Sequence, residues 1–442
     1  MSTARTVDAP ILRAADLGPR VWSAIVVLAL AGELAWAIEN FYLNVFVYDT
    51  ITDDPDVIAT MVAASAITST LATIVFGALS DRLGRRRAFV AVGYLLWGGS
   101  TAAFGLLTVE TVRVIAPLAD ATLVASTAII VLDCVMSMLG SGAYDAAFQA
   151  WVTDVTRPQI RGRVESVLAV APLVSTLAVF GGLDGLARAG RWQLFFGLVG
   201  VTVSVMGVVS CFLVRDVARP SLTEQRFLAS VLYGLRPRAI RANPGLYLAL
   251  AAWSLWGIST QVFLPYLLIY MQNYLRIQAY ALVLGVFLLG AAAVTVVGGR
   301  IIDRVGKTRF LLPAVLVYVA GLALMWLARG TGPVVVAGFV MMSGFMLVLA
   351  PVGALVRDYT PPGRAGHVQG LRMIFTVLIP MVVGPYVGAT VIKNSATYVD
   401  MGVVKQVPTP TMFLAALAVA ALILPPVAAL RHRPPALPVA PA

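Results

Sequence analysis

Two short stretches decide how this sequence is organised: GALSDRLGRRRAFV at residues 77–90 and GRIIDRVGKTRFLL at residues 299–312. Each places an aspartate and several basic residues between two long apolar runs. The 442-residue chain is 60% hydrophobic and only 12% charged, whereas soluble domains carry about 25% charged residues. The apolar runs approach the roughly 20 residues that a helix needs to cross a bilayer. The sequence therefore predicts an all-α polytopic membrane protein.

Twelve transmembrane spans fit the apolar runs. They are expected at 21–48, 57–79, 88–108, 121–148, 164–187, 192–214, 245–272, 279–300, 309–328, 332–355, 367–392 and 411–430. This division predicts a tail at 1–20, a six-helix bundle at 21–214, a central loop at 215–244, a second six-helix bundle at 245–430 and a tail at 431–442. Residues 1–20 carry charges throughout and lack an apolar core, so we expect no cleaved signal peptide.

The positions of the basic residues predict the topology. With both termini inside, 24 of the 32 Lys and Arg residues fall in the tails, the inner loops or the span ends that border them, 7 in the outer loops and one, Arg372, deeper within a span. This asymmetry follows the positive-inside rule, and the turn at 49–56 is acidic, as an outer loop can be. We therefore expect both termini in the cytoplasm and the protein in the cell (inner) membrane. The net charge of +11 reports this topology, and nucleic acid is not an expected partner.

The two halves of the chain repeat. A shift of 222 residues aligns 77–84 with 299–306, including Asp81 with Asp303, and it also aligns Glu39 with Gln261. A shift of 204 residues aligns the stretches that begin at Asp154 and Asp358. Chance similarity between apolar segments explains matched Leu and Val residues, but it explains matched Asp, Gly and Pro poorly. Six spans repeated in the same orientation imply two bundles related by an axis along the membrane normal.

The loop at 77–86 resembles the signature of the major facilitator superfamily, G-x-L-x-D-R-x-G-R-[RK]. The glycines of such a tight turn predict close backbone approach or a positive φ. The resemblance implies alternating access, with the loop acting as a conformational latch between the halves. The matching residues are Gly77, Leu79, Asp81, Arg82, Gly84, Arg85 and Arg86, with Asp303 and Arg304 in the degenerate second copy.

Acidic residues inside the spans are candidate binding residues because ionisable groups in the bilayer are costly and usually functional. Glu33 lies near the middle of the first span, and a regular helix places it on one face with Asn40 and Asn44. Asp145 lies well inside the fourth span, one turn before Gln149. Such buried carboxyl groups suit proton carriage, although each could instead hold two helices together.

Other polar residues in the spans have weaker assignments. We expect Glu39 to point away from Glu33 and to bond between helices, and Asp133 to lie on a different face from Asp145, near the outer end of its span. Asp184 and Arg188 are four residues apart, which predicts a surface ion pair.

The fourth span also resembles that of glycoside-pentoside-hexuronide:cation symporters, because DAAFQAW at 145–151 keeps the acidic and aromatic positions of their motif without its proline. The resemblance implies a sugar or glycoside as substrate. Sodium-coupled members carry two aspartates in span two, where this chain has Ser69 and Thr73. Coupling to H⁺, or facilitation without a coupling ion, is therefore expected. Gln261 and Tyr266 in span seven are candidate contacts to a sugar.

Arg372, about two turns into span eleven, could pair with Asp145, bind an anionic substrate or extend to the interface. A proton-coupled drug or metabolite exporter of the same superfamily is the main alternative function, and a transporter-like sensor is the next. The sequence shows no nucleophile–base pair, zinc spacing or phosphate loop, so we expect no enzyme, no cofactor and no metal. The expected partners are a small-molecule substrate and membrane lipids, with a monomeric chain.

Overall fold

The structure is a computed structural model that describes residues 17–156, 158–216, 237–360, 370–393, 397–400 and 403–432. The predicted tails and central loop lie largely outside these residues. Its helices in the first half are α1 (Pro19–Ala37), α2 (Asn44–Thr50), α3 (Pro55–Leu83), α4 (Arg86–Phe104), α5 (Val109–Ile115), α6 (Ala121–Gly140), α7 (Gln149–Val155), α8 (Pro158–Gly182), α9 (Asp184–Arg188) and α10 (Trp192–Leu213). Those in the second half are α12 (Pro237–Ala242), α13 (Pro244–Phe263), α14 (Leu267–Ile269), α15 (Tyr280–Val305), α16 (Lys307–Leu327), α17 (Thr331–Asp358), α19 (Ile379–Lys393), α20 (Thr411–Ala421) and α21 (Leu424–Arg431).

Short segments of different winding join several of these helices into longer spans. The π-helical segments are η1 (Ile38–Leu43), η2 (Ser141–Phe148), η4 (Tyr270–Tyr274) and η5 (Ile374–Leu378), and η3 (Leu264–Tyr266) is a 3₁₀ turn. Eleven spans in the described residues are long and apolar enough to cross a membrane, and α4 with α5 makes a twelfth if this bent pair is counted as one. The prediction of a multi-pass α-helical membrane protein is confirmed.

The third predicted span, 88–108, corresponds to α4, which ends at Phe104. Helix α5 begins at Val109, just beyond that span, and turns away from α4 by 89°. Thr108 starts the new helix because its side chain accepts a hydrogen bond from the Thr111 backbone N–H at 3.2 Å. Such N-capping by threonine stabilises a helix start, and the sequence analysis overlooked it.

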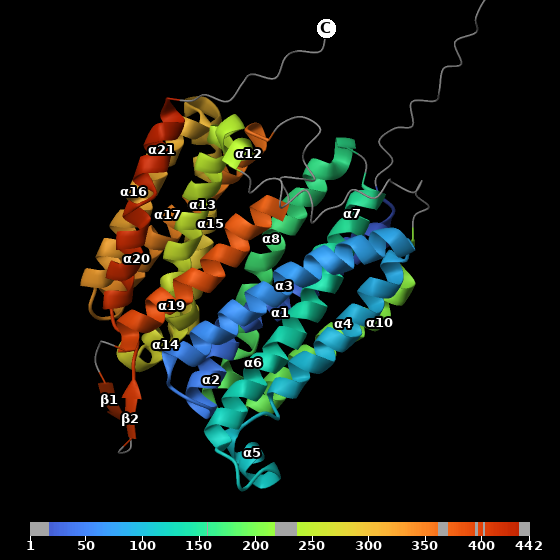
Figure 1. Cartoon of the computed structure of the whole chain (residues 1–442), viewed down its shortest axis with the longest axis vertical. Coiled ribbons are helices and arrows are strands. Elements are labelled where there is room, and N and C mark those ends of the chain that lie inside the picture. Colours follow the sequence, from blue (N-terminus) through green and yellow to red (C-terminus); the bar gives the residue numbers. More distant parts are fainter. Residues whose placement is uncertain are drawn as a thin grey trace, which may run out of the picture.

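The spans form two six-helix bundles, one from each half of the chain. In Figure 1 the first half, blue to green, lies mainly on the right, and the second half, yellow to red, lies on the left. Helices α3 and α19 run side by side where the two bundles meet. We call the end of the molecule that carries the turn at 49–56 the Asp54 end, and the end that carries the loop at 77–86 the Asp81 end. This two-bundle arrangement is the predicted fold.

The second glycine of each repeated loop adopts the positive φ expected of it. Gly84 has φ +62° and Gly306 has φ +89°. Residues that carry a Cβ rarely adopt these backbone conformations. Each glycine lets one long helix stop and the next begin at once, α3 before α4 and α15 before α16. Gly77 shows no such need, because a Cβ there would meet only the Ala146 side chain at 3.9 Å.

A small hairpin connects the last two spans at the Asp54 end, and the sequence analysis did not foresee it. Strands β1 (Thr397–Asp400) and β2 (Val403–Gln406) pair antiparallel, with Thr397 opposite Gln406. Figure 1 shows this hairpin below α14 and α19. Strand β2 is held against the first half, because the Gln406 backbone N–H donates to Asp53 Oδ2 at 2.6 Å and Tyr48 donates its hydroxyl to Gln406 O at 3.0 Å.

Close helix contact through small residues holds the first bundle together. A Cβ on Gly98 in α4 would lie 2.3 Å from Gly200 O in α10, and a Cβ on Gly200 would lie 2.4 Å from Gly98 O. Gly207 makes a similar approach to the backbone of Leu95. Because lipid tails are as apolar as helix surfaces, such close van der Waals packing is a main source of helix association in membranes.

We predict that Gly98→Ala lowers the stability of the first bundle, because the new methyl group would overlap the α10 backbone. An overpacked site of this kind costs about 1–3 kcal/mol, which thermal unfolding in detergent would report as a lower midpoint. Gly99→Ala is the matched control, since a Cβ at Gly99 has no atom within 4 Å. Equal unfolding midpoints for the two variants would contradict this account of the α4–α10 contact.

Candidate functional site

The winding of the first span decides which of its polar residues lie together. The sequence prediction placed Glu33, Asn40 and Asn44 on one face of a regular helix. The π-helical segment η1 lies between Glu33 and Asn44, and its wider turn changes the register beyond Ala37. As a result, Glu39 lies beside Asn40 and Asn44. The prediction assumed 3.6 residues per turn throughout, and in the pocket described next it is Glu39, and not Glu33, that accompanies Asn40 and Asn44.

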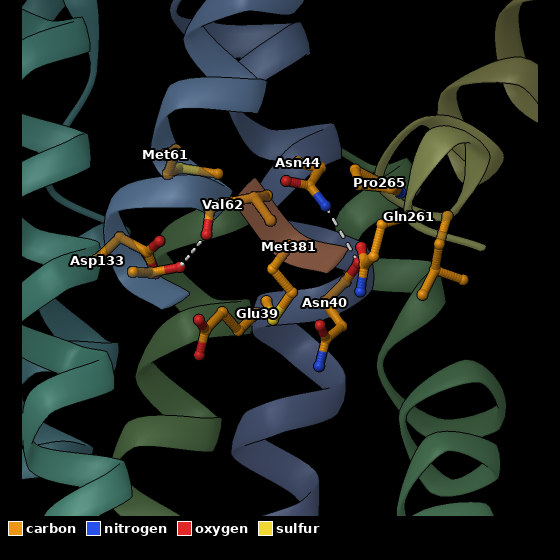
Figure 2. Close-up of a pocket in the computed structure, with 11 residues that line it drawn as sticks. Glu39, Asn40, Asn44, Met61, Val62, Asp133, Gln261, Pro265 and Met381 are labelled. Atoms are coloured by element: carbon orange, nitrogen blue, oxygen red, sulfur yellow. Dashed lines mark hydrogen bonds between the residues drawn. The ribbon is translucent and has the colours of Figure 1, made fainter. Parts of the chain in front are cut away.

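A pocket lies where the first span meets the second half (Figure 2). Figure 2 shows Asp133 and Glu39 on one side, Gln261 and Pro265 on the other, and Asn40 and Asn44 beside them. The full set that lines the pocket is Glu39, Asn40, Asn44, Met61, Val62, Ser65, Asp133, Gln261, Leu264, Pro265 and Met381. Both halves therefore contribute to it. Glu39 and Gln261, which the 222-residue repeat aligns, line this same pocket.

Three oxygen acceptors in the pocket lack a hydrogen-bond donor among the described residues: Glu39 Oε2, Asn44 Oδ1 and Asp133 Oδ1. Asp133 and Asn44 are each only 1% exposed. Asn44 uses its amide N–H to reach Asn40 O at 3.1 Å, which leaves its oxygen free. A buried acceptor without a donor costs about 1–3 kcal/mol. A ligand that brings hydrogen-bond donors would complete these groups. In the closed conformation the pocket has room for about one water molecule, so a larger solute requires the two halves to part.

Glu33 and Asp145 form a second polar group in the first half. Tyr144 donates its hydroxyl to Glu33 Oε1 at 2.8 Å, and Glu33 and Asp145 interact electrostatically. The Tyr144 ring fits here because residue 32 is glycine, where a Cβ would lie 2.6 Å from the ring. The structure therefore brings together the two carboxyl groups singled out from the sequence, although neither lines the pocket described above.

The remaining predicted binding residues lie in different places. Gln149 begins α7 and is partly exposed. The Arg372 guanidinium lies over the Trp253 ring at 5.6 Å from its centroid, and in the part of the chain that the structure describes it forms no ion pair with Asp145. Tyr266 is 1% exposed, and its hydroxyl lies 3.1 Å from Pro55 O and 3.0 Å from Pro385 O. Tyr266 thus joins the two halves in this conformation.

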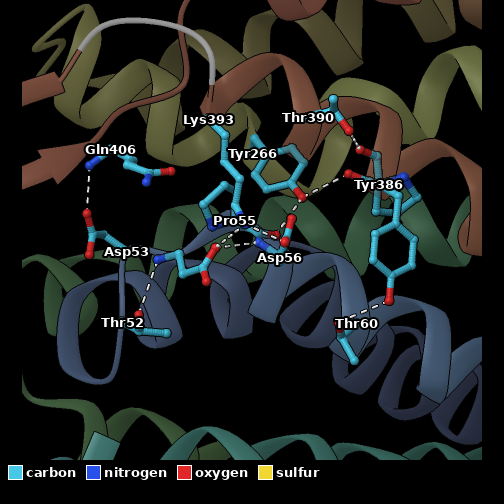
Figure 3. Close-up of polar contacts among 12 residues, drawn as sticks. Thr52, Asp53, Pro55, Asp56, Thr60, Tyr266, Tyr386, Thr390, Lys393 and Gln406 are labelled. Atoms are coloured by element: carbon cyan, nitrogen blue, oxygen red, sulfur yellow. Dashed lines mark hydrogen bonds and ion pairs between the residues drawn. The ribbon is translucent and has the colours of Figure 1, made fainter. Parts of the chain in front are cut away.

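The two halves are bonded to each other at the Asp54 end (Figure 3). Lys393, the last residue of α19, forms ion pairs with Asp54, at 3.3 Å, and with Asp56. Thr60 and Tyr386 share a hydrogen bond of 3.0 Å between their hydroxyl oxygens. These contacts join the start of α3 to the last turns of α19.

A buried acidic residue adds to this closed end. Asp184 is 3% exposed and pairs with Arg188 at 2.8 Å, so the predicted ion pair exists but is not a surface pair. The reason is that Asp184 Oδ1 also accepts hydrogen bonds from two tyrosine hydroxyls, Tyr42 of the first half at 2.9 Å and Tyr280 of the second half. Arg188 in turn donates to Gln278 O at 3.3 Å.

At the Asp81 end, the ion pairs of Arg86 and of Lys307 each join residues of the same half. Arg86 is buried and pairs with Asp81 and, at 3.5 Å, with Asp154. Lys307 pairs with Asp358 at 2.6 Å in the second half. The side chain of Asp303 lies outside the described part of the chain. Arg82, Arg85 and Arg304 are exposed. The latch role of these residues stays a prediction, and the protein is in a conformation closed at the Asp54 end.

The comparisons with known proteins decide the family. The family model described as Major Facilitator Superfamily matches residues 25–385 and 257–442. The chain belongs to this superfamily. It is accordingly a transporter of small molecules and not an enzyme, as predicted. No curated protein sequence matches it.

Solved structures share the fold at low sequence identity. A point variant of the nucleoside transporter NupG superposes with a TM-score of 0.73 at 10% identity, covering 92% of this chain and 98% of that one. The D-xylose-proton symporter superposes with a TM-score of 0.66 at 15% identity, covering 91% and 97%. At these identities the likeness concerns the fold alone.

Sequence reasoning missed the grouping of Glu39 and Asp133 with the amides. One signal was available, because the repeat aligned Glu39 with Gln261, and equivalent positions of two related bundles can meet at the axis between them. Asp133 carried no comparable signal. Its place beside Glu39 depends on how α6 packs against α3 and η1, which a single sequence does not specify.

We predict that Lys393→Ala weakens closure at the Asp54 end. Its two ion pairs are partly exposed, so each contributes about 0–1 kcal/mol, and the open population should rise by about thirtyfold at most. Spin labels can be attached at Glu110 and Thr331, both exposed at this end, once Cys134 and Cys211 are replaced. A larger open population would then appear as additional long distances between the two labels.

Lys307→Ala is the matched control for this measurement. It breaks an ion pair whose partners both lie in the second half, so it should leave the label distances at the Asp54 end unchanged. An unaltered distance distribution in the Lys393 variant would show that the ion pairs do not hold this end closed.

Proposed function

We propose that this protein is a secondary active transporter that carries a small polar solute, a sugar or glycoside, by alternating access coupled to H⁺ symport. The observation that carries the proposal is the pocket between the halves, in which Asn40, Asn44 and Gln261 stand beside unpaired buried acceptors. Carboxamides both donate and accept hydrogen bonds, and hydroxyl groups on a solute would complete them.

The composition of the pocket favours an uncharged, hydroxyl-bearing solute. Among the described residues that line it, none is basic, so an anionic solute would find no counter-charge. Met61, Val62, Leu264 and Met381 provide apolar walls, which suit the carbon face of a sugar ring. Two of the solved structures with a similar fold are a nucleoside transporter and a D-xylose-proton symporter, and both of these solutes bear hydroxyl groups.

The contacts at the closed Asp54 end indicate which bonds would break when the pocket opens to the other side of the membrane. The pocket lies just inside the contacts made by Pro55, Tyr266 and Lys393. Release of these contacts with closure of the opposite end would expose the same pocket to the other side of the membrane. On the predicted topology, with both termini in the cytoplasm of the cell (inner) membrane, the Asp54 end faces outward.

Proton-coupled export of a drug or metabolite is the alternative function. Such exporters carry a G-x-x-x-G-P-x-x-G-G stretch in span five, which this chain lacks there. GPYVG at residues 384–388 in span eleven resembles part of it, but the structure gives these glycines a packing role. A Cβ on Gly384 would lie 2.4 Å from the Gln261 Cβ, and one on Gly388 would lie 2.2 Å from Val262 O. The pair brings α19 against α13, which positions Gln261.

The substrate class can be tested with the purified protein. Bound ligand stabilises the folded state by RT ln(1 + [L]/Kd), about 2.7 kcal/mol at one hundred times Kd. We would measure thermal unfolding with D-xylose, uridine and a phenyl glycoside, and with a lipophilic cation and a dicarboxylate for comparison. Stabilisation by the hydroxyl-bearing solutes, followed by their uptake into proteoliposomes, supports the proposal. Stabilisation by the cation alone would favour the exporter.

We predict that Gln261→Ala weakens binding of the solute found in that screen. Loss of one or two hydrogen bonds of about 1 kcal/mol each should raise KM by roughly five- to thirtyfold. The measurement is initial uptake rate against solute concentration. Gln193→Ala, which alters an exposed glutamine at the start of α10, is the control and should leave KM unchanged. An unchanged KM in both variants would remove Gln261 from the binding site.

A further inference from the structure

A pair of acidic residues in the pocket lies outside the carboxyl groups that the sequence singled out for coupling. Glu39 and Asp133 come from different helices, η1 and α6, and interact electrostatically. Ser137 donates its hydroxyl to Glu39 Oε1 at 2.8 Å. The other oxygen of Glu39 and Oδ1 of Asp133 are buried without a partner in the described residues. Asp133 is 1% exposed and lines the pocket.

The surroundings offer this pair no positive charge. Helix α3 presents Ser65 and Thr68, which do not ionise, while α13, η3 and α19 present Gln261, Leu264, Pro265 and Met381. The other titratable groups that the pair meets are Asp145 of η2 and Cys134 of α6, and neither can supply a positive charge. Two carboxylates that share a site of low polarity without a cation cannot both stay ionised.

We propose that Glu39 and Asp133 together hold the transported proton. The pair takes up one H⁺ on the unpaired oxygens and then carries a single negative charge, and it releases that H⁺ to water when the pocket opens to the other side. Binding of one H⁺ removes the repulsion between the two carboxylates, which no neighbouring cation offsets among the described residues. The inference rests on the proposed symport, and it moves the proton from Glu33 and Asp145 to a pair that lines the pocket itself.

Infrared difference spectroscopy of the reconstituted protein tests proton binding without any substrate. The wild-type chain should show the carbonyl band of a protonated carboxyl group that disappears as the pH is raised. The double variant E39Q/D133N should lose this band. In each single variant, the midpoint should move to lower pH by roughly one unit or more, because the neighbouring charge is gone.

Asp120→Asn is the matched control for the spectra. Asp120 is exposed and caps α6 through the backbone N–H groups of Thr122 and Leu123, a role that asparagine fills equally well. This variant should keep the wild-type band and midpoint. A band that survives unchanged in E39Q and in D133N, or that the wild type lacks, would overturn the assignment. If the double variant does not fold, the midpoint shifts of the two single variants still test the assignment.

Transport assays separate this inference from the proposed function. D133N should abolish uphill accumulation driven by a pH gradient in proteoliposomes while retaining exchange of solute, probed with D-xylose and uridine, because exchange requires no net proton movement. Accumulation by D133N equal to that of the wild type would overturn the inference and leave the transporter standing. The wild type could instead transport neither probe and still show the carboxyl band, with the variants losing it. That result would support the proton pair and count against the proposed substrate.

Discussion

The bilayer's low polarity is the constraint on which this structure depends. Every polar group placed inside it needs a partner, because no water is available to provide one. Most of the buried polar groups here satisfy that need: Tyr42 and Tyr280 bond to Asp184, Tyr144 to Glu33 and Ser137 to Glu39. Nine described side-chain atoms are buried without a partner, and three of them are the oxygens of Glu39, Asn44 and Asp133. These three gather at one pocket between the halves, which is where a transporter must leave room for its cargo.

The bundle architecture was accessible from sequence because it depends on long-range averages. Hydropathy over about 20 residues locates a span, and the repeat of Asp81 at Asp303 reports two related halves. The positive φ at Gly84 and Gly306 was accessible for a local reason, since a helix that stops within one turn calls for glycine. These inferences require only composition, spacing and backbone sterics.

The pocket was only partly accessible because it depends on local departures from regular winding. Asn40, Asn44 and Gln261 were predicted as binding residues, and they line the pocket, but the prediction grouped Glu33 with them. The π-helical segment η1 exchanges Glu33 for Glu39 on that face. Similarly, Tyr266 looked like a sugar contact, yet its hydroxyl reaches two backbone carbonyls at the closed end. Residue type alone identifies a polar side chain inside a span, but the residues packed around it decide whether it lines the pocket or joins the two halves.

The pocket and the closed end are built from the same helices, and this gives a physical route from binding to movement. On α13 and η3, Gln261 and Pro265 line the pocket, and Tyr266 follows directly with its bond across the halves. On α19, Met381 lines the pocket one turn before Pro385, whose carbonyl Tyr266 meets. A solute or proton that changes the contacts at Gln261 therefore acts on the irregular segment that follows α13. Tyr266 in that segment helps to hold the Asp54 end closed. Because 3₁₀ and π-helical turns surround the joint, a small change there can be absorbed by rewinding and need not bend a whole span.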